Sequence, residues 1–152
     1  MAVALIVSLV ENMLPPLMPI LPYAKLGLSN VVLLAVLMLF GIPEGYLILV
    51  LKCVIIAVFS GNFSILLWSL PAGLLAFSTM VLLKNLKIFS ITGMSVAGGI
   101  VHNVVQILVA SYIIGKSVFI YLPYMMLAGG LAGLFTGICC HFLVVAINKK
   151  TI

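Results

Sequence analysis

The stretch ITGMSVAGGIVHNVVQILVASYII, residues 91–114, decides the class of fold. About 20 apolar residues in a helix cross the roughly 30 Å hydrocarbon core of a bilayer. This stretch is longer than that and carries no charged side chain, so it predicts a membrane-spanning helix. It also places His102, Asn103 and Gln106 within five positions, although lipid offers such side chains no hydrogen-bond partner.

The composition of the whole chain agrees with a membrane protein. Of the 152 residues, 66% are hydrophobic and 6% are charged, whereas a soluble domain carries about 25% charged residues. A net charge of +5 would suggest a nucleic-acid partner in a soluble protein. Here most of the lysines stand near the ends of apolar runs, where they orient a membrane protein instead, so no nucleic acid is expected.

The apolar runs predict one domain over 1–152, an all-α integral membrane protein built as a six-transmembrane-helix bundle. Each break between the runs holds Gly, Pro, Asn or Lys, which interrupt helices. Four lysines against two favour the side that holds both termini, so both termini are predicted to be cytoplasmic. The predicted spans are 1–14, 26–41, 44–60, 64–83, 91–114 and 118–147.

Lys52 lies near the middle of the third predicted span, where a lysine costs on the order of 3 kcal/mol to insert. It requires a carboxylate, a cavity or an anionic ligand. Glu11 is a candidate partner, because the other acid, Glu44, lies at the turn where this span begins. His102 is predicted at the same depth, and the remaining polar side chains lie progressively further out, in the order Asn103, Gln106, Glu11, Asn62.

Two interpretations of these polar groups stay open. They line a solute pocket that opens to the outside, or they form a satisfied network that sets how the helices pack. The segment 15–25 contains four prolines and cannot be helical throughout, so it is either a lid over the pocket or a rigid connector. Tyr23 and Trp68 would add stacking surface to a pocket.

Small residues form a stripe at four-residue spacing in the last predicted span, at Gly129, Gly133 and Gly137. Such a stripe allows close approach of another helix, either within the bundle or from a partner membrane protein. Ala4 and Ser8 make a weaker version in the first span. Cys53, Cys139 and Cys140 lie in apolar runs and are expected to be packing residues.

No motif for chemistry is present. The sequence lacks a nucleotide-binding P-loop, an H-E-x-x-H motif and a Cys/His cluster, and with only two acids nothing in it resembles a Ser-His-acid arrangement. We therefore expect no catalytic residue, no metal and no cofactor, and we expect that the chain is not an enzyme.

The stretches KLGLSN (25–30), VVLLAVLMLFG (31–41) and FSITGMSVAGGIVHN (89–103) resemble the heptaprenyl diphosphate synthase component I family, whose members are also called Gx transporter proteins. The resemblance runs from Glu11 to about Lys149. This family commonly carries arginine where Lys52 stands, so the charge is kept but the two-pronged hydrogen bonding of a guanidinium is lost.

The family is similar to the substrate-binding S components of energy-coupling factor (ECF) transporters. That resemblance implies a six-helix fold with an outward-facing pocket, a T-component membrane protein and two cytosolic ATPases as partners, and a bacterial cytoplasmic membrane. It implies that Ala4 and Ser8 contact the T component and that 15–25 closes the pocket. The predicted function is capture of a small solute, with an anionic one favoured by Lys52. The alternative is a noncatalytic membrane accessory subunit of heptaprenyl diphosphate synthesis.

Overall fold

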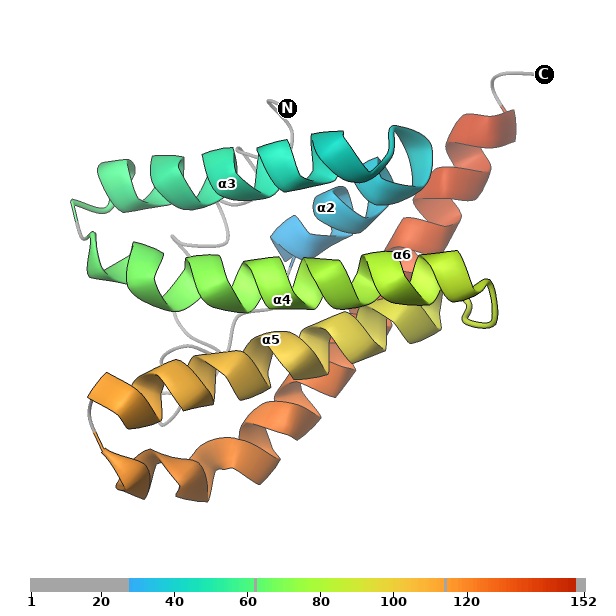
Figure 1. Cartoon of the computed structure of the whole chain (residues 1–152). Coiled ribbons are helices and arrows are strands. Elements are labelled where there is room, and N and C mark those ends of the chain that lie inside the picture. Colours follow the sequence, from blue (N-terminus) through green and yellow to red (C-terminus); the bar gives the residue numbers. More distant parts are fainter. Residues whose placement is uncertain (1–27, 62, 114, 150–152) are drawn as a thin grey trace.

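The computed structural model describes residues 28–61, 63–113 and 115–149, and over these ranges the chain is helical with no strand (Figure 1). Each α-helix lies mostly within one of the apolar runs. The elements are α2 (Leu28–Leu39), α3 (Ile42–Phe59), α4 (Ser64–Leu86), α5 (Ile91–Ile113), the 3-10 helix η1 (Lys116–Tyr121) and α6 (Leu122–Lys149).

Within the described ranges, four helical segments are long and apolar enough to cross a membrane: α3, α4, α5, and η1 continued by α6. The prediction of an all-α membrane bundle is therefore confirmed, whereas the count of six spans is not. The predicted first span, 1–14, and the proline-rich segment 15–25 lie outside the described residues.

Helix α2 is much shorter than its predicted span of 26–41. It has 12 residues, which at 1.5 Å per residue cover about 18 Å. The helix ends because Gly41 adopts a φ of 124°, a conformation that favours glycine. The amides of Phe40 and Gly41 both donate to the carbonyl of Val36 and close the last turn.

The helices from α3 to α6 each pack against the next one in the chain, and α2 contacts both α3 and α6. Figure 1 shows α3 and α4 side by side, with α6 crossing α5 obliquely. Residues 33 to 37 of α2 are all buried, as expected for a short helix that is apolar on every side. All of them except Val36 belong to one core cluster with side chains from the surrounding helices: Leu49, Phe77, Met80 and Cys140.

The glycine stripe of α6 packs inside the bundle, against α5. A Cβ atom added to Gly129 would lie 2.5 Å from the carbonyl oxygen of Gly99. A Cβ added to Gly133 would lie 2.6 Å from the carbonyl oxygen of Ser95, and one on Gly137 would lie 2.6 Å from the Cα of Thr92. Of the two open interpretations of this stripe, the structure therefore supports internal packing.

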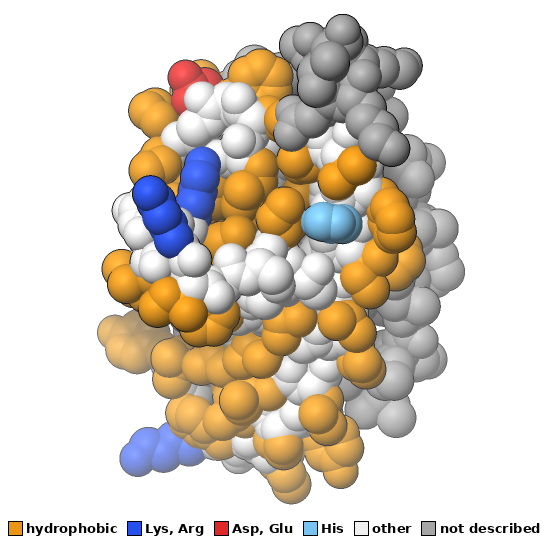
Figure 2. All heavy atoms as spheres, turned by 90° about the vertical axis from the view of Figure 1, so that its right-hand side faces the viewer, with side chains coloured by type: hydrophobic (Ala, Val, Ile, Leu, Met, Phe, Trp, Pro, Cys, Tyr) orange, Lys and Arg blue, Asp and Glu red, His pale blue; other side chains and the backbone are white. Residues whose placement is uncertain are grey.

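One end of the bundle, which we name the lysine end, holds the Gly41 corner, the turn after α4 and the last turns of α6 (Figure 1). Figure 2 looks onto this end and shows blue lysine side chains and a red acidic one among hydrophobic side chains. Lys84, in the last turn of α4, donates from Nζ to the carbonyl oxygen of Leu37, at 2.6 Å. This contact satisfies an α2 carbonyl that has no partner within its own helix.

We expect Lys84→Met to destabilise the protein by about 1–3 kcal/mol. The substitution removes a hydrogen bond donated by a charged group and leaves the carbonyl oxygen of Leu37 without this donor. The loss should appear as a lower melting temperature in detergent micelles and as faster amide exchange in α2. Lys116→Met, at the opposite end of the bundle, is the matched control. Equal melting temperatures for the two variants would contradict this role of Lys84.

Candidate functional site

Lys52 contacts the first turn of α2. Its Nζ lies 3.4 Å from Oδ1 of Asn30 and donates a hydrogen bond to it. Asn30 is the third residue of α2, and Lys52 is the eleventh of the 18 residues of α3. Because α2 is short, its amino end lies level with the middle of α3. A half-buried lysine and a helix amino end therefore meet near the middle of the membrane-spanning region.

The electrostatics of this arrangement favour a negative charge. The amino end of a helix carries a partial positive charge, and the ammonium of Lys52 adds a full one close to it. The amide oxygen of Asn30 accepts a hydrogen bond but carries no net charge.

Asn103 faces α6. Its Nδ2 donates to the carbonyl oxygen of Met125 at 2.7 Å, and a Cβ on Gly129 would lie 2.7 Å from the same nitrogen. The side chain thus fits into the space that the glycine leaves between α5 and α6. The contact links the two helices and sets how far one is shifted along the other.

Gln106 and Ser95 each bury an oxygen atom that has no hydrogen-bond partner in the part of the chain that the structure describes. Ser95 is 1% exposed and packs where Gly133 and Gly137 pass α5. Gln106 lies eleven residues, about three turns, further along the same face, with half-buried His102 between them. A buried amide oxygen in an apolar interior favours a donor such as water or a ligand group.

The predicted site residues therefore fall into two groups. Lys52 meets α2, whereas Asn103 meets α6, and helix α4 lies between the α3 and α5 that carry them. Trp68 is half-buried in the second turn of α4. The remaining predicted residues lie outside the described ranges: Ala4, Ser8, Glu11, Tyr23 and Asn62.

Asn30 is the residue that the sequence argument missed. It stands at the end of KLGLSN, one of the stretches that carry the family resemblance, and it is polar at the edge of a long apolar run. Its place in that stretch and its polar side chain together could have identified it as a candidate site residue. Its pairing with Lys52 depends on the position of the corner at Gly41 and on which faces of α2 and α3 meet.

Comparison with known proteins identifies the family to which the chain belongs. No curated protein and no solved structure matches the chain significantly. A family model described as heptaprenyl diphosphate synthase component I matches residues 1–143, which include all the described helices except the end of α6. On the strength of a match over nearly its whole length, the chain belongs to the heptaprenyl diphosphate synthase component I family.

Proposed function

We propose that this chain is a membrane subunit that captures a small anionic solute from outside the cell, as S components of ECF importers do, and that it is not itself an enzyme. The observation that carries the proposal is the contact between Lys52 and Asn30 at the amino end of α2, a helix of 12 residues that is too short to span the membrane. A mid-membrane cation beside a helix amino end is an arrangement that transporters use for carboxylates and other anions.

The solute would carry a carboxylate or a phosphate. Lys52 would supply charge, and Asn30 and the first amides of α2 would supply hydrogen bonds. Reorientation of the subunit would be driven by a T component and two cytosolic ATPases in a bacterial cytoplasmic membrane.

The family description supports a second candidate, a noncatalytic accessory subunit of heptaprenyl diphosphate synthesis. A prenyl diphosphate synthase needs Asp-rich motifs that hold magnesium, and this sequence contains no aspartate. Under this alternative the chain would assist a soluble partner component that supplies the chemistry.

Native mass spectrometry of the gently solubilised full chain, expressed with its natural neighbours, distinguishes the two. We expect a bound small anion together with a membrane T component and ATPases. Recovery of a soluble prenyl diphosphate synthase, without ATPases, would favour the accessory role. If the protein is folded but no small molecule is detected bound to it after purification from cells, the result would count against solute capture.

A further inference from the structure

The turn that follows α4 holds a lysine in a disfavoured backbone conformation. Lys87 caps α4 with a φ of 56°, in the left-handed region, and its amide donates to the carbonyl of Lys84. No other non-glycine residue in the described ranges has a positive φ. Glycine takes this capping position at no steric cost. A lysine in place of glycine at this position puts a positive charge on the turn.

The residues around Lys87 are apolar and exposed. Leu86 is 50% exposed, Ile88 is 78% exposed and Phe89 is 48% exposed. Lys84 turns inward to the carbonyl of Leu37, whereas Lys87 is exposed on the surface of the turn. The turn therefore presents one cation flanked by large hydrophobic side chains at the end of a membrane-spanning helix.

We propose that the turn Leu86–Phe89 binds the anionic phospholipid surface at the lysine end of the bundle. Lysines close to an anionic leaflet are attracted to its phosphates, and exposed Ile and Phe beside them enter the boundary between headgroups and acyl chains. An acidic soluble protein would satisfy Lys87 but would not require three large hydrophobic side chains around it. The inference is independent of whether the bundle captures a solute.

The test compares Lys87→Asn with Lys116→Asn. Asparagine tolerates the left-handed conformation, so the first variant removes the charge and keeps the turn. Lys116 is an exposed lysine at the opposite end of the bundle and is the matched control. The full chain in zwitterionic micelles is titrated with phosphatidylglycerol, and bound lipid is counted by native mass spectrometry. We expect Lys87→Asn to weaken lipid binding about fivefold, equivalent to about 1 kcal/mol, and Lys116→Asn to leave it unchanged.

Two further measurements test whether the turn binds a lipid surface or a free phosphate. Ile88→Ser should also weaken phosphatidylglycerol binding, because it removes the hydrophobic side chain that is most exposed in the turn. Millimolar inorganic phosphate should not displace the lipid if the turn recognises a membrane surface, and displacement would indicate a free-phosphate site. Equal losses for Lys87→Asn and Lys116→Asn, or no loss for Lys87→Asn, would overturn the proposal.

Discussion

Gly129→Ala is expected to destabilise the bundle by about 3 kcal/mol, the upper end of the usual range for overpacking. The added methyl group would lie 2.5 Å from the carbonyl oxygen of Gly99 and 2.7 Å from Nδ2 of Asn103. A flexible side chain can turn away from such a clash, but the Gly99 oxygen belongs to the backbone of α5. Relief requires that α5 and α6 separate, which would also stretch the hydrogen bond from Asn103 to Met125.

The next residue provides the matched control. A Cβ on Gly130 would meet Ile100 at 3.8 Å, an ordinary contact, and alanine favours a helix over glycine by up to about 1 kcal/mol. Gly130→Ala should therefore be neutral or stabilising. Melting temperatures of both variants in one detergent measure the difference. Similar melting temperatures would mean that α5 and α6 pack less closely at Gly129 than in the structure.

Lys52→Met is expected to weaken binding of the captured anion by about 30-fold or more, the loss typical when one member of a buried charged pair is removed. Lys52→Arg keeps the charge and should retain most of the affinity. Asn30→Leu should have a smaller effect, about fivefold, because it removes one uncharged hydrogen-bonding group. The compound that native mass spectrometry identifies in the wild type is the ligand for these measurements, made by equilibrium binding.

Melting temperatures separate loss of binding from loss of folding. Lys52→Met removes an insertion cost on the order of 3 kcal/mol but also removes the hydrogen bond to Asn30, so affinities are compared at a temperature at which the variant is folded. Lys116→Met, which alters a lysine at the end of the bundle, should bind the anion normally. Full affinity in Lys52→Met would remove this residue from the site and leave the accessory role as the stronger proposal.

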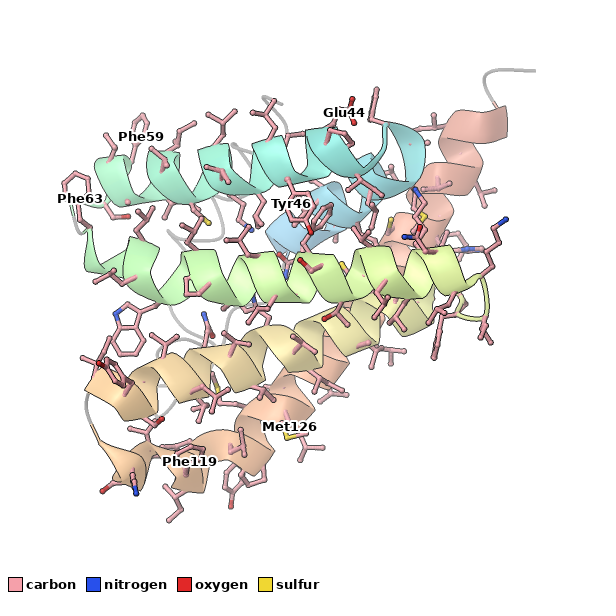
Figure 3. The ribbon with its side chains drawn as sticks, viewed as in Figure 1. Glu44, Tyr46, Phe59, Phe63, Phe119 and Met126 are labelled. Atoms are coloured by element: carbon pink, nitrogen blue, oxygen red, sulfur yellow. The ribbon has the colours of Figure 1, made fainter. Side chains whose placement is uncertain are left out.

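The positions of the long helices could be predicted from the sequence because length and hydropathy are local properties. The runs 64–83 and 91–114 correspond to α4 and α5 within a few residues. The run 118–147 begins earlier than α6 because Lys116–Tyr121 forms a 3-10 helix that joins it. Exposed aromatic side chains at the end opposite the lysine end, among them Phe59, Phe63 and Phe119 (Figure 3), suit a membrane interface.

The length of α2 depends on tertiary contacts as well as on local sequence. The apolar run continues to Phe40, but Gly41 and the contact from Lys84 end the helix beside α4. Asn30 and Lys52 each lie 11 residues from Gly41, so the corner there brings them level. Which faces of α2 and α3 meet is decided by packing and not by this spacing.

By itself, the sequence determined that this is a helical membrane protein and where its long helices run. It also determined that Lys52, Asn103 and Gln106 are polar side chains in an apolar setting. Only the tertiary structure decided which helix each polar or small face meets: Lys52 meets α2, and Asn103 and the glycine stripe meet between α5 and α6. The physical reason is that apolar side chains surround these helices on every side, since lipid accepts them as readily as the core does. Periodicity then shows which residues share a face but not where that face points.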